Sequence, residues 1–164
     1  MAGKIGPYLT GRKNADFGWG FYLSPDKDFI YRWAGKNAVV NEYELDTTGL
    51  EIHRFTRDLD WFQYIFDNRR TMDSLTADVI IGPIANDTIF DTMGILSSGL
   101  LAPEEAMDLL LIGPSYAQVA IKTEKAARQL QWLRSERIVQ MNEEERLVEQ
   151  NAYQEALAAA MEGK

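Results

Sequence analysis

The chain has 164 residues, which is close to the usual size of one domain. Its formal net charge of −8 argues against a protein that holds DNA or RNA through a general electrostatic surface. There is no cysteine and one histidine, His53, so the sequence excludes a disulfide framework and thiol chemistry and disfavours a zinc site. Neither a signal peptide nor a membrane-spanning apolar run is found, and we expect a cytoplasmic protein with no membrane partner.

Short strands and helices are predicted along the first half of the chain. Ser24 before Pro25 and Asp58 before an apolar periodic segment are typical helix starts. The expected elements are strands over 20–24, 38–45, 50–55 and 77–82, and helices over 25–34 and 58–68.

The second half is predicted to be richer in helix. The expected elements are helices from Asn86 or Asp87 to 97, over 103–113, over 123–133 and over 142–161, and strands over 116–122 and 136–140. The mixture predicts an α+β fold with a mostly antiparallel sheet. We expect one domain over 1–140 and a C-terminal acidic helix over 141–164 packed on it.

The C-terminal acidic helix has two interpretations. Leu147, Tyr153, Leu157 and Met161 form an apolar stripe at helical spacing. The stripe can pack on the helix's own domain, with the acidic face in solvent, or it can bind a partner protein.

An aromatic segment near the N-terminus is the strongest candidate for a ligand site. Gly18 and Gly20 lead the chain into the strand Phe21-Tyr22-Leu23, and the following helix carries a second aromatic group, Trp33. Rings from the strand and the helix can wall a cleft for a flat ligand. The simpler alternative is a tight turn that leads into a core strand.

Several sequence blocks stand in a characteristic order over residues 5–138. The blocks are Asp16-Phe17-Gly18-x-Gly20-Phe21-Tyr22-Leu23-Ser24, Trp33-Ala34, Val39-Val40-Asn41-x-Tyr43, Trp61, Asn68-Arg69, the segment from Asp78 through Gly82-Pro83-Ile84-Ala85-Asn86-Asp87, and Gln118-x-Ala120-x-x-Thr123-Glu124. On these blocks the chain resembles a bacterial family of uncharacterised domains grouped with the ADP-ribosyltransferase superfamily.

The resemblance implies split antiparallel sheets with surrounding helices, and NAD⁺ bound as a substrate, without a metal, in a cleft between two small sheets. Gly20, Phe21 and Tyr22 resemble the superfamily strand that lines the nicotinamide pocket. Trp33 stands where the superfamily has a second stacking aromatic residue. Gln118 stands at the position of the catalytic glutamate, and we expect it to orient the ribose.

Two departures from the superfamily pattern bear on catalysis. The Tyr-His-Gly element of its first strand is not found, so that strand is expected to be missing. Glutamine at 118 can form a hydrogen bond with a ribose hydroxyl, but it cannot act as a general base or carry negative charge.

Each candidate residue also has a purely structural interpretation. Tyr22 and Trp33 can be core aromatic residues. Asn86 and Asp87 can be a helix cap and a first-turn acid instead of substrate contacts. Arg12 can meet the NAD⁺ pyrophosphate or lie in solvent.

The expected function is that of an NAD-dependent ADP-ribosyltransferase, which transfers ADP-ribose to an unknown protein or nucleic-acid acceptor. A toxin-like role is one form that this activity can take. The alternative is a catalytically inactive module of the same fold that binds NAD, ADP-ribose or a partner. Release of nicotinamide separates the two, because only the enzyme produces it.

Overall fold

A computed structural model of the chain describes residues 13, 15–35, 37–70, 73, 75–85 and 115–138, and scattered positions between 147 and 162. Its elements are β1 (Phe21–Leu23), α1 (Lys27–Trp33), β2 (Val39–Leu45), β3 (Ile52–Arg54), α2 (Leu59–Arg70), β4 (Val79–Pro83), β5 (Ala117–Ile121), α5 (Glu124–Arg128) and β6 (Leu130–Arg137). The described part of the chain is thus a mixed α+β structure, as its sequence predicts.

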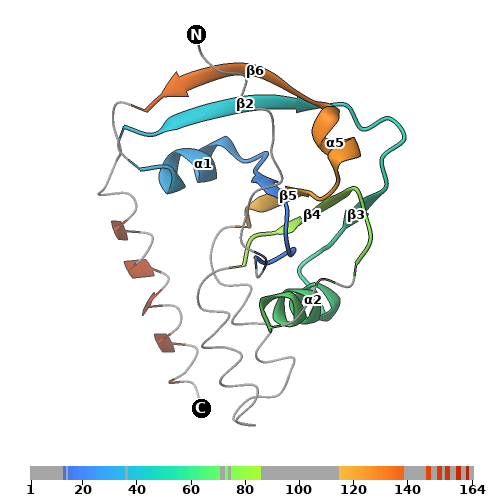
Figure 1. Cartoon of the computed structure of the whole chain (residues 1–164). Coiled ribbons are helices and arrows are strands. Elements are labelled where there is room, and N and C mark those ends of the chain that lie inside the picture. The colour runs from blue at the N-terminus through green and yellow to red at the C-terminus, as the bar shows by residue number, and fades with distance from the viewer. Residues whose placement is uncertain are drawn as a thin grey trace.

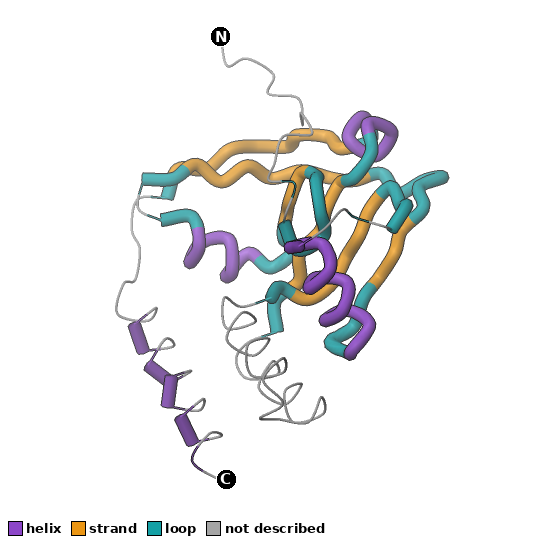
Figure 2. The backbone as a smooth tube through the Cα atoms, turned by 60° about the horizontal axis from the view of Figure 1, so that its bottom comes forward, coloured by secondary structure: helices purple, strands orange, loops and turns teal. Residues whose placement is uncertain are grey.

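The strands form two sheets. A four-stranded sheet has the order β1-β5-β4-β3, and a two-stranded sheet pairs β2 with β6. Among the described strands, three of the four pairs are antiparallel, and β3 and β4 run parallel. Figure 1 shows the two-stranded sheet above the four-stranded sheet and α2 below it. The four-stranded sheet is therefore covered on both faces, by α2 on one and by the two-stranded sheet and α5 on the other (Figure 2).

Alternation along β4 and β5 divides the core into two clusters. Ile80 and Ala120 point to the α2 side, where they meet the buried Trp61 and Ile65. Their neighbours Val79 and Ile121 point to the other side, toward α5. This is the division that period-two side-chain direction imposes on a strand buried on both faces. The rings of Phe21 and Tyr43, 5.9 Å apart and nearly perpendicular, join the two sheets.

The start of α2 follows the cap that its sequence predicts. A carboxylate oxygen of Asp58 accepts from the backbone N–H of Trp61 at 2.9 Å. Its hydrogen bonds, from the Thr56 hydroxyl first and from the Trp61 backbone second, lower the pKa of Asp58 below its ordinary value. Trp61, Phe62 and Ile65 then form the buried face of the helix.

The start of α1 differs from the predicted one. We expected Ser24 to cap a helix beginning at Pro25, but the N-cap is Asp26 and the helix begins at Lys27. The Ser24 hydroxyl accepts from the Asp26 N–H at 3.1 Å and donates to the Ala117 carbonyl at 2.7 Å, while the Asp26 carboxylate accepts from the Ala117 N–H at 2.6 Å. The Asp26 carboxylate is thus bound to the first residue of β5, and it forms no cap hydrogen bond to its own helix.

The predicted helix over 123–133 is wrong in its second half. Thr123 caps α5 by accepting from the Ala126 N–H, but the helix ends at Arg128 and β6 begins at Leu130. Leu130 pairs with Leu45 across the two-stranded sheet. Hydrogen bonds along the whole of β2 outweigh the helical propensity of these residues, a tertiary effect that local sequence does not contain.

The C-terminal acidic helix is only partly described. The described positions between 147 and 162 are helical, and Leu147 and Val148 are 58% and 67% exposed. Both the division of the chain at 140 and the partner-binding role of this helix stay predictions. Among the described residues, no helix combines the length and the apolar character needed to cross a bilayer.

We predict that Gly18→Ala destabilises the fold more than Gly49→Ala. Both glycines have positive φ, +72° and +70°, so both substitutions strain the backbone by about 1–2 kcal/mol. At Gly18 the new Cβ would also lie 2.6 Å from a carboxylate oxygen of Asp73, whereas nothing lies within 4 Å at Gly49. Urea denaturation of both variants measures the difference, and equal losses would show that Asp73 can move aside.

The acid stability of the fold is predicted to depend on Asp78. Its hydrogen bonds, from the Glu51 N–H first and the Thr123 hydroxyl second, lower its pKa below the ordinary 3.8. The stabilisation is therefore complete above about pH 4 and is lost as the pH falls through the lower folded value. In thermal melts between pH 2 and 7, Asp78→Asn should lower the melting temperature most at neutral pH. Glu124→Gln, at a 78% exposed side chain, should leave the pH profile unchanged.

Candidate functional site

Tyr22 closes the turn that precedes its own strand. It pairs with Ala120 in the β1–β5 register, and its ring packs against the core cluster on the α2 side. Its hydroxyl accepts from the Phe17 N–H at 3.0 Å and donates to the Gly18 carbonyl at 2.6 Å. Burial raises the pKa of Tyr22 well above its ordinary value of 10, so its hydroxyl stays protonated near neutral pH. Tyr22 can therefore contribute a ring surface, but it is not a base.

Gln118 lies on the same face of the sheet as Tyr22. It is two residues before Ala120 on β5, so Gln118 and Tyr22 are diagonal neighbours on adjacent strands, about 7–8 Å apart. Its side-chain amide lies 3.4 Å from a carboxylate oxygen of Asp16 and 3.4 Å from the Pro83 carbonyl. Both distances are longer than an ordinary hydrogen bond. The amide of Gln118 therefore makes two long hydrogen bonds, each weaker than an ordinary one.

Asp16 lies beside Gln118, although the sequence patterns do not single it out as a candidate. Its side chain is 14% exposed, and its Oδ1 accepts from Arg69 Nε at 2.7 Å and lies 2.5 Å from Arg69 Nη2. The Asp16 carbonyl accepts from the Asn68 side chain at 3.1 Å. The only sequence signal was that Asp16 and Asn68-Arg69 both belong to the quoted blocks, since nothing local pairs residues 53 positions apart.

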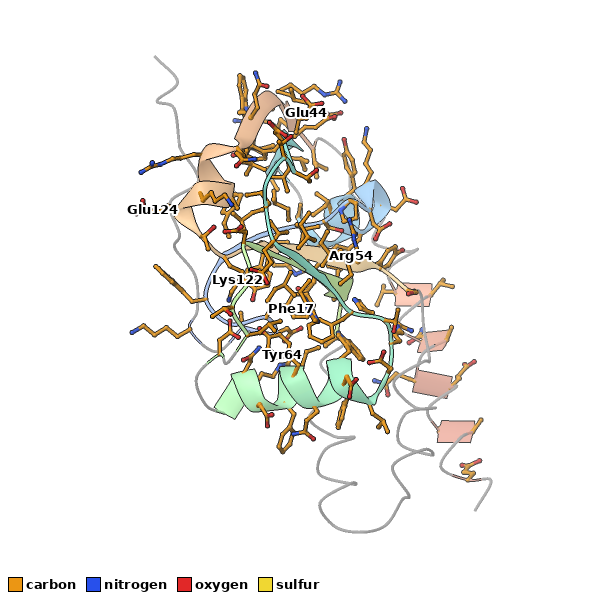
Figure 3. The ribbon with its side chains drawn as sticks, turned by 90° about the vertical axis from the view of Figure 1, so that its right-hand side faces the viewer. Phe17, Glu44, Arg54, Tyr64, Lys122 and Glu124 are labelled. Atoms are coloured by element: carbon orange, nitrogen blue, oxygen red, sulfur yellow. The ribbon has the colours of Figure 1, made fainter. Side chains whose placement is uncertain are left out.

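Lys122 and Asp73 form a second polar group, which holds Phe17, the residue after Asp16. The Lys122 ammonium forms an ion pair with Asp73 at 2.6 Å and also donates to the Phe17 carbonyl. Tyr64 donates to the other carboxylate oxygen of Asp73 at 2.5 Å, and burial together with this bond raises the pKa of Tyr64. Figure 3 shows Phe17 and Tyr64 above α2 with Lys122 beside them, while Glu124 lies at the outer edge of the molecule.

The side chains of β1 alternate between the two faces of the four-stranded sheet. Phe21 points away from Tyr22 and meets Tyr43 of the two-stranded sheet. At Gly20 an added Cβ would lie 2.7 Å from the Ile121 carbonyl, so a glycine is needed for β1 to approach β5 this closely. The glycine at position 20 is therefore explained by strand packing without a ligand, and Phe21 joins the two sheets.

Trp33 ends α1 with its side chain 78% exposed. It is not a core residue, and its ring is open to solvent and available for stacking.

Arg12, Asn86 and Asp87 lie outside the described residues, so their roles stay predictions. His53 lies in β3 with its ring 4.4 Å from that of Phe55. Within the described ranges, no three His, Asp or Glu side chains are grouped so as to hold a metal ion.

The arrangement combines a ring, an amide and a carboxylate at one end of the sheet. Tyr22, Gln118 and Asp16 are linked through the turn and through the contact between the Gln118 amide and the Asp16 carboxylate. Such a group can accept and donate hydrogen bonds to sugar hydroxyls beside an aromatic surface.

The comparisons with known proteins point to one family. No curated protein and no solved structure matches the chain. Residues 7–132 match a family described as "Protein of unknown function (DUF3990)", and this range contains the turn, both sheets up to Trp132, and the three linked side chains. Because the match covers more than half of the sequence, the chain belongs to the DUF3990 family.

Proposed function

We propose that this protein is an NAD-dependent ADP-ribosyltransferase-like protein whose site is built on Tyr22, Gln118 and Trp33. The observation that supports it best is the position of Gln118, on the same sheet face as Tyr22 and beside a carboxylate. The order of the sequence blocks also supports the proposal. Tyr22 and Gln118, however, lie on the α2 face of the four-stranded sheet and not between the two sheets, where the resemblance places NAD⁺. The acceptor is a protein or a nucleic acid, and a toxin-like role falls within the same activity.

In this proposal the aromatic rings bind nicotinamide. A flat cationic ring gains from stacking on an aromatic face, and both Trp33 and the ring of Tyr22 are candidates for that surface. Trp33 has the greater freedom because its side chain is 78% exposed, whereas the Tyr22 hydroxyl is bound to the turn. Stacking would hold the leaving group in place and exclude water from one side of the bond that breaks.

Gln118 positions the ribose in this proposal. Its amide can donate to one hydroxyl and accept from another, and its present contacts at 3.4 Å are weak enough to be exchanged. In this class of reaction the bond from ribose C1′ to nicotinamide breaks with its electrons leaving on nicotinamide, a nucleophile of the acceptor bonds to C1′, and its proton passes to water. Gln118 orients and does not take that proton.

The second candidate is a non-catalytic module that binds NAD⁺ or ADP-ribose. Two observations favour it: the residue at 118 has no charge, and the Tyr22 hydroxyl is committed to the turn. Such a module would retain affinity without releasing nicotinamide.

The first test is nicotinamide release from NAD⁺ by the purified 164-residue chain, with NAD⁺ binding measured by calorimetry on the same sample. We expect Gln118→Ala to lower the release rate by about tenfold or more, because an orienting hydrogen bond is lost. The matched control is Gln131→Ala, which removes an exposed glutamine from β6. Equal activity of both variants would remove Gln118 from the site, and binding without release by the parent chain would favour the module.

The stacking role of Trp33 has a separate test. Trp33→Ala should weaken NAD⁺ binding about tenfold, equivalent to the loss of about 1.4 kcal/mol of stacking, with no loss of stability because the side chain is exposed. Trp132→Ala is the control, since Trp132 is also exposed, at 55%, but lies on β6. If calorimetry gives the same affinity for both variants, Trp33 takes no part in NAD⁺ binding.

A further inference from the structure

We infer that Asp16 supplies the negative charge that Gln118 cannot provide, as the acidic residue of the site. The inference rests on the proposed function and extends it to a residue that does not belong to strand β5. The juxtaposition that carries it is the distance of 3.4 Å between Gln118 Nε2 and Asp16 Oδ2, across 102 positions of sequence.

The two oxygens of the Asp16 carboxylate have different surroundings. Arg69 contacts Oδ1 through both Nε and Nη2, at 2.7 and 2.5 Å. Oδ2 faces the Gln118 amide instead, at a distance too long for a strong hydrogen bond. Arg69 therefore fixes the orientation of the carboxylate through one oxygen and leaves the other directed toward the glutamine. A ribose hydroxyl placed there can donate to Oδ2 and accept from Gln118.

The backbone around Asp16 is held before any ligand arrives. The Asp16 carbonyl accepts from Asn68, whose side chain is 1% exposed in the core. The next residue, Phe17, is held at its N–H by Tyr22 and at its carbonyl by Lys122. A charge fixed in this way needs no reorganisation when positive charge develops on the sugar, which is the condition for effective electrostatic stabilisation.

Burial strengthens the effect of the charge. The Asp16 and Arg69 side chains are only 14% and 11% exposed, so water screens the carboxylate less than it would a surface acid. Arg69 lies on the Oδ1 side, and the side toward Gln118 is therefore the more negative one. The Asp16–Arg69 pair is neutral as a whole, so the Gln118 position faces the negative end of this ion pair, where a catalytic glutamate at 118 would carry its own charge.

The test uses the full chain with three proteins: the parent, Asp16→Asn, and the double variant Asp16→Asn with Gln118→Glu. Asparagine keeps the size of the side chain and removes the charge. We expect Asp16→Asn to melt at a lower temperature, because the buried Arg69 loses its charged partner. Its NAD⁺ affinity should fall by no more than about tenfold, the value of one hydrogen bond to the ribose, whereas its release of nicotinamide should slow about 100-fold, the usual cost of losing one electrostatic stabiliser. The double variant returns a carboxylate to the same place from β5, and we expect its release rate to recover by about tenfold.

Thermal melts of all three proteins, set beside NAD⁺ binding and release, separate charge from structure. If Asp16 only holds the turn through Arg69, both variants lose stability, NAD⁺ binding and release together, and Gln118→Glu restores nothing. That result, or release by Asp16→Asn at the parent rate, overturns the inference while leaving the proposed function in place. If the parent chain binds NAD⁺ without releasing nicotinamide, or does not bind it, the proposed enzyme activity fails first and the role of Asp16 fails with it.

Discussion

The hydroxyl of Tyr22 bonds to two backbone groups of one turn, the N–H of Phe17 and the carbonyl of Gly18. This closure directs Phe17 into the core, where its side chain is fully buried and its ring lies 6.0 Å from that of Phe55. It also places Asp16 against Arg69 of α2. A single hydroxyl thus couples the start of β1, the packing of the α2 face and the position of the Asp16 carboxylate beside the Gln118 amide.

The same turn explains why charged residues occupy this part of the core. Lys122 follows β5, and Asp73 follows α2. The Lys122 ammonium donates to the Phe17 carbonyl and pairs with Asp73, which also accepts from the Tyr64 hydroxyl. Removing one partner of such a group leaves a buried charge unpaired, which costs far more than the pair contributes in isolation. The network therefore specifies the position of the turn more than it adds to total stability, and a defined turn position is what a binding site at its edge requires.

Structural and functional interpretations of Tyr22 are compatible. Its hydroxyl is occupied by the turn and its ring packs in the core cluster, as expected of a core tyrosine. On the neighbouring strand, diagonally across from Tyr22, the Gln118 side chain makes two long hydrogen bonds, and these constrain it less than the Tyr22 hydroxyl is constrained. Trp33, with its exposed ring, lies outside the core. Within the proposed site, the Tyr22 hydroxyl is thus framework, and the Tyr22 ring, Gln118, Asp16 and Trp33 are the groups proposed to meet a ligand.

Local sequence determined the elements whose signals are short in range. The cap at Asp58 and the apolar spacing after it predicted α2, and the glycine turn before Phe21-Tyr22-Leu23 predicted β1, because caps, glycines and periodicity act within a few residues. Alternation along the short strand β5 likewise places Gln118 on the face opposite Val119 and Ile121. Tertiary structure alone decided that residues after Leu130 form a strand, since that depends on hydrogen bonds to β2. It also decided that Asp16 lies beside Gln118 and Arg69, because the energy of those contacts comes from residues brought together by folding.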